Sequence, residues 1–353
     1  MDAKPRHRWA SLDDHGDAAS GDAVQVPLFD LPEREIGTGE FRGLEFVHVR
    51  ARRIVNVVPD RSPVPFRYTI NAYRGCSHAC TYCFARPTHA YLDLDPSTEF
   101  DRVIVVKVNA VERLRAELAP KRWQGDHIAM GTNTDPYQRA EGKYRLTRGI
   151  VEVLTEAGNP FSILTKGTLI LRDLDVLAEA ARRTHVEASF SIGTLDEDVW
   201  RATEPGTPHP MRRVEAVARL NEAGIPCGVL VAPVLPGLSD RREQLDAVVR
   251  ACVEAGARSI SPVLLHLRPG VREHYLGWLA DHRPDLLADH RSRYRRAYAP
   301  SAQRAALSET VRELVAAHRR RVAKRAAPMS SRFDFSRRDR SHSTAPGRSQ
   351  GAR

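Results

Sequence analysis

The sequence predicts an α/β protein built on a partial, open (β/α)6 barrel of the TIM type, with a C-terminal helix and disordered termini. The first observation is a joint that occurs three times, in which a helical pattern ends in Ala-Gly and an apolar run follows: TEAGNPFSILTK, NEAGIPCGVLVAP and VEAGARSISPVLL. Gly158, Gly224 and Gly256 stand where a helix C-cap favours a left-handed residue, and the apolar runs suit buried parallel strands. The joints lie 66 and 32 residues apart. This fits one strand–helix unit per ~33 residues, with one unit hidden between the first two joints.

Six candidate strands follow from this spacing, with helical patterns between them. They lie near residues 68–74, 127–131, 161–165, 186–192, 227–232 and 259–265. The 218 residues from 68 to 285 hold about six units and fall short of the ~250 residues of a closed eight-unit barrel. We therefore expect an open barrel, whose functional residues come from the carboxyl ends of the strands.

The chain divides into five segments on composition and pattern. Residues 1–35 are expected to be a disordered N-terminus, 36–64 a short β-rich preface, 65–290 the partial barrel, 291–326 a helical segment and 327–353 a basic disordered tail. In the helical segment, Leu307, Val311, Leu314 and Val315 recur at helical spacing.

The positive charge of the chain is concentrated at its C-terminal end. Lys and Arg exceed Asp and Glu by 54 − 44 = 10, and residues 318–353 alone carry eleven Lys or Arg against two Asp. Such a segment can bind nucleic acid through phosphate groups, or it can be a solvated tail. No stretch has the ~18 consecutive apolar residues of a membrane helix, and the start has no apolar signal core. We expect a cytoplasmic protein without a membrane partner.

Three of the five cysteines form a compact motif. The string GCSHACTYCFAR places Cys76, Cys80 and Cys83 in a Cys-x3-Cys-x2-Cys pattern, and three thiolates on one loop leave one corner of a metal centre open. An iron–sulfur cube held by three cysteines leaves its fourth iron free for a small chelating molecule. A zinc ion completed by His78 or His89 is one alternative, although no second ligand pair is present, and buried thiols without a metal are the other. The other two, Cys227 and Cys252, are expected to be buried and hydrophobe-like.

This motif resembles the signature of the radical S-adenosylmethionine (SAM) superfamily. Further strings, NAYRGCSHACTYCFARPTH, GTNTDPYQ, ILTKG, SFSIGTLD, TEPGTPHPMRR and GVLVAP, are similar to the branch that contains spore photoproduct lyase and DNA-repair-photolyase-like proteins. The resemblance covers roughly residues 65–270. It implies a 4Fe-4S cluster after the first barrel strand, cleavage of S-adenosyl-L-methionine to methionine and a 5'-deoxyadenosyl radical, and hydrogen abstraction by that radical. It also implies an external electron donor of the flavodoxin or ferredoxin type.

The resemblance assigns site residues as well. Cys76, Cys80 and Cys83 match the cluster ligands, while no catalytic residue is assigned. Six residues match cofactor-binding positions: Tyr82, Gly131, Asn133, Asp135, Lys166 and Ser191. Among them, Tyr82 matches the neighbourhood of the adenine, and Lys166 and Ser191 match contacts to the S-adenosylmethionine carboxylate and ribose. The segment 131–135 can instead be an Asx-turn before Pro136.

Three further features admit both a functional and a structural interpretation. Glu204 and Thr207 stand in a Glu-Pro-Gly-Thr string that can be a structural turn, and Arg213 can be a helix-surface charge. His266 and Arg268 follow the sixth strand, where substrate contacts occur, although a lone histidine is more often a local structural residue.

The substrate is left open by the sequence. The stretch GTNTDPYQ lacks the hydrogen-donating cysteine that spore photoproduct lyase carries after its second barrel strand. A lyase-like DNA-repair activity on nucleic acid is one hypothesis, and a radical SAM enzyme that modifies a protein or small metabolite is the second. A noncatalytic iron–sulfur or zinc-binding interaction protein is the third, from another class.

Overall fold

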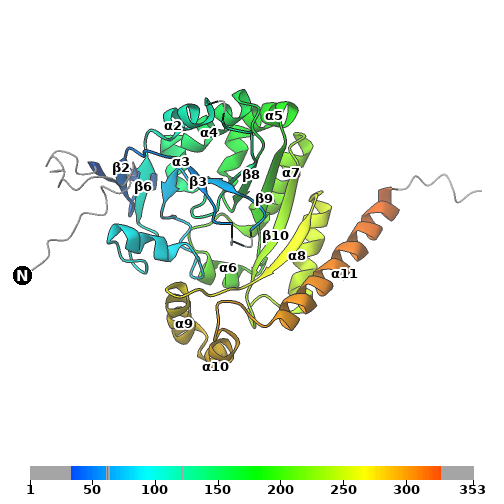
Figure 1. The fold of residues 1–353 in the computed structure, drawn as a ribbon. Helices are drawn as coiled ribbons and strands as arrows, with labels where there is room; N and C mark the ends of the chain where they lie inside the picture. The colour runs from blue at the N-terminus through cyan, green and yellow to red at the C-terminus, as the bar shows by residue number, and fades with distance from the viewer. Residues whose placement is uncertain (1–32, 61, 63, 121, 327–353) are drawn as a thin grey trace, which may run out of the picture.

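The computed structural model describes residues 33–60, 62, 64–120 and 122–326, and its centre is a seven-stranded sheet (Figure 1). The strand order is β11-β10-β9-β8-β7-β4-β3. The strands are β3 (Val55–Val57), β4 (Tyr68–Ile70), β7 (Ile128–Met130), β8 (Phe161–Thr165), β9 (Val186–Ser191), β10 (Cys227–Val234) and β11 (Ile260–Leu264). From β4 to β11 neighbouring strands are parallel and follow chain order, whereas β3 joins β4 antiparallel. The edges β3 and β11 lie at opposite ends of the sheet, which confirms a partial, open (β/α)6 barrel.

Helices cover the outside of this sheet, as parallel strands require crossover connections (Figure 1). They include α2 (Ala110–Leu118), α3 (Arg139–Tyr144), α4 (Leu146–Glu156), α5 (Leu174–Arg183), α6 (Glu197–Thr203), α7 (Pro210–Glu222) and α8 (Arg242–Glu254). The three glycines of the repeated joint follow α4, α7 and α8 with φ values of 61°, 78° and 74°. The expected left-handed C-caps are therefore confirmed.

The last helices lie beyond the sixth barrel strand. They are α9 (Val271–His282), α10 (Pro284–Arg293) and α11 (Ser301–Ala326). In α11, Val311 and Leu314 are buried and Leu307 and Val315 pack against the same core, so the helical spacing was interpreted correctly. The long α11 lies along α8 (Figure 1). None of the helices in the described ranges combines the length and apolarity needed to cross a bilayer.

A second sheet of four strands stands beside the barrel, in the order β1-β2-β6-β5. Its strands are β1 (Glu33–Ile36), β2 (Glu45–Val49), β5 (Tyr73–Arg74) and β6 (Val103–Lys107). The single strand expected at 68–74 is thus two strands in different sheets, because the chain leaves the barrel after β4 and pairs β5 with β6. The buried run of β6, VIVVK, was missed.

The expectation of disordered termini concerns residues that fall almost entirely outside the described ranges. Residues 1–32 and 327–353 are not described. Residues 33–35, which the sequence analysis placed in the disordered N-terminus, belong instead to β1, where they pair with β2.

The barrel interior is filled with aliphatic and aromatic side chains from the strands and the inner faces of the helices. Cys227 and Cys252 belong to this core and are fully buried, as expected. Burial raises the pKa of each thiol to about 12, so both stay protonated and behave as small apolar residues.

Candidate functional site

The three clustered cysteines lie on one loop that begins after β5 and ends at the short helix η2 (Arg86–Leu92). Gly75 opens the loop with a φ of 83°, and a Cβ on it would come within 2.7 Å of a backbone oxygen of β6. Ala79 also has a positive φ, 54°, which is uncommon for a residue other than glycine. The amide of Ala79 donates to Cys76 O at 3.3 Å, and that of Cys83 donates to Cys80 O at 3.3 Å. Two tight turns, one for each spacing of the motif, therefore gather the cysteines.

A buried glutamine holds the first half of this loop. Gln138 is fully buried; its Oε1 accepts from the amide of Ser77 at 2.9 Å, and its Nε2 donates to Gly75 O at 2.9 Å. The hydroxyl of Thr134 donates to the same carbonyl at 2.6 Å. The backbone of the loop is thus fixed by side chains that follow β7, the second barrel strand.

An arginine holds the second half of the loop, and a glycine packs against the first. Arg86, 2% exposed, donates from Nε to Cys80 O at 3.2 Å and binds both carboxylate oxygens of Asp101 at 3.2 and 3.1 Å. Gly206 approaches from the other side, where an added Cβ would lie 2.1 Å from Ser77 O. The loop is clamped between two parts of the chain that are far apart in sequence.

The thiols themselves are largely desolvated. Burial raises the pKa of Cys76, Cys80 and Cys83, that of Cys80 to about 12, so without a cation beside them they stay protonated. Within the described residues, no three His, Cys, Asp or Glu side chains come close enough to hold one metal ion. A cube is held differently, because each cysteine binds a separate iron. His78 faces a carboxylate and His89 Nε2 lies 3.0 Å from a β6 carbonyl, so neither completes a zinc site with the cysteines.

A buried charged group lies against this loop at the carboxyl ends of β8 and β9. Lys166 Nζ donates to Ser191 Oγ at 2.8 Å and lies 3.1 Å from Glu204 Oε1. Arg213 Nη2 lies 2.6 Å from the other oxygen, Glu204 Oε2, and the Tyr82 hydroxyl donates to Oε1. We call these five residues the charged group. Burial alone would raise the pKa of Glu204, but Arg213 and Lys166 lower it to about 2.

Asp135 ties the end of β7 to the end of β8. Its Oδ1 accepts from the amide of Tyr137 at 2.8 Å, which is the expected Asx-turn, and from the Thr165 hydroxyl at 2.6 Å. Its Oδ2 accepts from the amide of Lys166 at 2.7 Å and lies 3.3 Å from His78 Nδ1. Burial opposes ionisation, but the nearby His78 and these hydrogen bonds keep the pKa of Asp135 low. Both oxygens of Asp135 are engaged by protein groups.

The other two residues of this segment have different surroundings. Gly131 has a φ of 88°, and a Cβ there would lie 1.9 Å from Leu164 O, so close packing against β8 requires glycine. The amide of Asn133 donates to Asn71 Oδ1 at 3.1 Å, while its own side chain is exposed. Neither residue contacts the charged group.

The Glu-Pro-Gly-Thr string forms a turn that joins the loop to the charged group. Thr207 Oγ1 donates to Glu204 O at 2.8 Å and accepts from Arg213 and from Trp200 Nε1. Arg213 is 1% exposed and also donates to Ser191 O at 3.1 Å, so it is no helix-surface charge. The turn is structural and also places the Glu204 carboxylate between Lys166 and Arg213.

His266 lies in a row of three rings that starts beside the cysteine loop. The Phe84 ring lies 5.7 Å from the His266 ring, which stacks on Tyr298 at 5.5 Å between ring centroids. Phe84 and Tyr298 are 41% and 45% exposed. Burial, then the charge of the exposed Arg268, lowers the pKa of His266. We call Phe84, His266 and Tyr298 the aromatic row.

A pocket of about 390 Å³ borders the loop on its outer side. His78, Tyr137, Arg139 and Gly206 contribute to its lining, but none of the three cysteines and no member of the charged group does. The cysteines and the charged group therefore do not meet in this pocket.

Of the residues that the sequence suggested, the structure brings Tyr82, Lys166 and Ser191 together, with Asp135 bound to the backbone of Lys166. Gly131 and Asn133 do not contact these residues. Gln138 and the central position of Glu204 were missed. The conjunction of Glu-Pro-Gly-Thr with Lys166 and Arg213 was a signal for Glu204, and Gln138 closes the string GTNTDPYQ, although nothing in that string shows that it binds the cysteine loop.

The chain is similar to a known protein family and to several known proteins. Residues 70–249, just over half of the chain, match the family described as Radical SAM superfamily. An uncharacterised protein of Mycobacterium tuberculosis is 46% identical over 296 residues, which cover 84% of this chain and 87% of that protein. A radical SAM Nα-GlyT isomerase of Pseudomonas phage M6 is 24% identical over 46% of this chain and 32% of its own length.

Solved structures resemble this fold. A variant of spore photoproduct lyase with dinucleoside spore photoproduct superposes with a TM-score of 0.58 and 16% identity, covering 77% of this chain and 79% of that one. The family match, the relatives and the partial barrel agree. The chain is an enzyme that belongs to the radical SAM superfamily.

Proposed function

We propose that this enzyme holds a 4Fe-4S cluster through Cys76, Cys80 and Cys83 and binds S-adenosylmethionine at the remaining iron. The observation that carries the proposal is the set of three thiols on one clamped loop, with Cys76 and Cys80 buried and Cys83 partly exposed, in an arrangement unsuited to a single ion. The residues present fit the group, because soft thiolate ligands favour iron–sulfur clusters and the cationic irons offset the cost of ionising buried thiols. When bound, the cluster supplies one electron that cleaves S-adenosylmethionine to methionine and a 5'-deoxyadenosyl radical.

The protein's own part is to bind, orient and exclude water. Lys166 presents a partly buried ammonium that can pair with the carboxylate of S-adenosylmethionine, and Ser191 offers a hydroxyl to its ribose. Glu204 holds the ammonium in place through its 3.1 Å contact, while Arg213 neutralises the second carboxylate oxygen. Tyr82 is fixed by the same carboxylate, with its ring 5.7 Å from Lys166 Nζ. Burial of this group lowers the local dielectric and strengthens its interactions.

We infer a nucleic acid as the substrate. The aromatic row supports this, since exposed rings bind nucleobases by stacking and Phe84 directly follows Cys83. The solved spore photoproduct lyase complex holds a dinucleoside photoproduct, while GTNTDPYQ has no cysteine, so we propose a different reaction on a related substrate. An external flavodoxin- or ferredoxin-type donor in a reducing cytoplasm fits the five free thiols.

The test is anaerobic assay of the iron-loaded enzyme with dithionite and S-adenosylmethionine. We expect 5'-deoxyadenosine, and we expect Lys166→Ala to raise KM for S-adenosylmethionine at least tenfold. The control is Lys143→Ala, which removes a lysine paired with Glu35. It should change neither the amount of 5'-deoxyadenosine nor the KM for S-adenosylmethionine. No 5'-deoxyadenosine from the loaded native enzyme would overturn the proposed chemistry.

A second experiment tests whether the substrate is a nucleic acid. With an oligonucleotide deuterated in its sugars and methyl groups, we expect deuterium in the 5'-deoxyadenosine. Product without deuterium would leave the chemistry standing and reject this nucleic acid in favour of a protein or small metabolite.

A further inference from the structure

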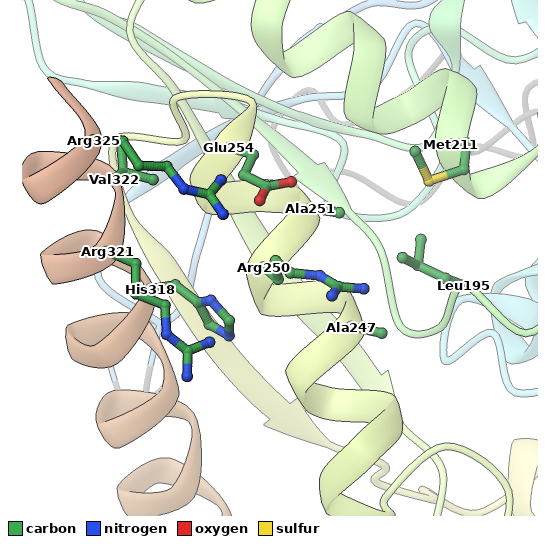
Figure 2. A pocket seen from close by; sticks show the side chains of 10 residues that line it. All are labelled: Leu195, Met211, Ala247, Arg250, Ala251, Glu254, His318, Arg321, Val322 and Arg325. Carbon is green, nitrogen blue, oxygen red and sulfur yellow. The ribbon is translucent and has the colours of Figure 1, made fainter.

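A basic pocket lies on the outer surface of the barrel, between α8 and α11 (Figure 2). Its volume is about 430 Å³. Arg250 projects from α8, and Arg321 and Arg325 project from α11 (Figure 2). An apolar part of the lining comes from Leu195, Met211, Ala247, Ala251 and Val322. We call this the α8–α11 pocket.

The charges of this pocket are unbalanced. In the part of the chain that the structure describes, none of Arg250, Arg321 and Arg325 has an ion-pair partner, and all three are exposed. Glu254 is the one carboxylate in the lining, and His318 is held by Asp246 at 2.8 Å. Three guanidinium groups therefore face one carboxylate.

The neighbouring surface of α11 extends this positive charge. Residues 318–326 contain five Arg or Lys and no Asp or Glu. Exposed helices usually alternate charges, and many other arginines of this chain pair with carboxylates, as Arg115 does with Glu156 and Arg201 with Glu197. A group of basic side chains without carboxylate partners among the described residues fits an anionic partner.

The positions of the arginines indicate an extended anion. Arg250 projects from α8 toward Leu195, whereas Arg321 and Arg325 lie on the α11 side (Figure 2). Because the guanidinium groups lie on both sides of α8, an anion with several successive phosphates fits them better than a single phosphate does. Leu195 and Met211, at the inner end, belong to the 191–213 segment that also carries Ser191, Glu204 and Arg213.

We propose that the α8–α11 pocket binds the phosphate backbone of the nucleic acid, at a surface separate from the cysteine loop. This inference rests on the proposed nucleic-acid substrate. Guanidinium groups bind phosphate oxygens in bidentate pairs, and each phosphate neutralised makes affinity more dependent on salt. The apolar side chains of the pocket can pack against the sugars and bases of the bound strand.

The test uses the full-length chain and a fluorescein-labelled 20-nucleotide single strand in an anisotropy titration. The variant R250Q/R321Q/R325Q keeps helix-forming side chains and removes three charges. We expect Kd to rise at least tenfold near 0.1 M salt, and the slope of log K against log salt to fall by about two, since each lost single-strand contact accounts for ~0.7.

Two full-length controls separate this surface from bulk charge. R42Q/R122Q/R291Q removes three other exposed arginines, and R332Q/R337Q/R338Q/R340Q neutralises much of the C-terminal tail. If the first control weakens binding as much as the pocket variant does, net charge alone explains it and the proposal fails. If the tail variant abolishes binding while the pocket variant leaves Kd unchanged, the proposal also fails.

Two further readouts sharpen the result. Equal competition by polyglutamate of matched charge would contradict recognition of phosphate. Formation of 5'-deoxyadenosine without nucleic acid should be equal in the pocket variant and the native enzyme, so loss of oligonucleotide binding alone is a failure of this surface and not of the proposed chemistry.

Discussion

Glu204 is the residue on which the charged group depends. Its two oxygens meet a lysine, an arginine and a tyrosine that come from three separate segments. Because burial would otherwise raise its pKa, the low value of about 2 shows that Lys166 and Arg213 more than offset desolvation. Glu204 is in turn the carboxylate that Lys166 and Arg213 share, at 3.1 and 2.6 Å.

We predict that Glu204→Gln lowers the free energy of unfolding by about 3–5 kcal/mol, because it leaves two buried cations without a counter-charge. Urea unfolding followed by circular dichroism measures this. Glu197→Gln, on the exposed surface of α6, removes an exposed pair with Arg201 and should cost less than ~1 kcal/mol. Equal losses for the two variants would show that the buried network is worth no more than a surface pair.

At this scale the sequence identified single residues but not their connections. Lys166 and Ser191 were assigned by resemblance, whereas the tie between Tyr82 and Glu204 spans 122 residues. No local pattern encodes a contact of that range. Gln138 was missed for the same reason, since it binds backbone groups of a loop 61 residues away. Arg86 was missed although it binds Cys80 O only six residues away, because the motif does not show which way its side chain turns.

The loop and the turn that clamps it are the elements that define the site. The turn fits only because Gly206 lacks a side chain, with Ser77 O 2.1 Å from where a Cβ would stand. The contact is with backbone, which cannot rotate away as a side chain can.

We predict that Gly206→Ala costs about 1–3 kcal/mol of stability through overpacking and shifts the cysteine loop. The matched control is Gly277→Ala in α9, where nothing lies within 4 Å of the added methyl group. At this position the change should raise the free energy of unfolding by about 0.5–1 kcal/mol, because alanine loses less backbone conformational freedom than glycine when the helix forms. Thermal unfolding of both variants, together with iron content after reconstitution, measures the difference. Unchanged stability and iron content in Gly206→Ala would contradict the clamp.

Elements with a repeated local signal could be predicted, and those defined by pairing partners could not. The run 161–165 matches β8 in full, because the glycine cap of the repeated joint precedes an apolar run there. The split between β4 and β5 was not foreseen, because residues 68–74 read as one apolar run and only the partner β6 shows that they belong to two sheets.

Over the whole molecule, the five thiols fall into two classes. Cys227 and Cys252 lie in the barrel core, while Cys76, Cys80 and Cys83 lie on the loop, and Cys83 is partly exposed. The raised pKa of the two core thiols, about 12, leaves almost no thiolate at pH 8.

We predict that iodoacetamide modifies Cys83 of the iron-free protein in its native state, because its side chain is partly exposed even though its pKa is raised, whereas the buried Cys227 and Cys252 react only as the chain unfolds. Peptide mass spectrometry across a urea series measures this, with fully denatured protein as the control for all five. Native-state labelling of Cys227 at the rate of Cys83 would contradict a closed barrel core.

Iron and sulfide analysis after anaerobic reconstitution tests the central claim most directly. The account predicts about four irons and four sulfides per chain, and loss of most of both in each of the single variants Cys76→Ala, Cys80→Ala and Cys83→Ala. Cys227→Ala and Cys252→Ala should retain the native content. One zinc per chain, or iron content indifferent to the three loop cysteines, would contradict it.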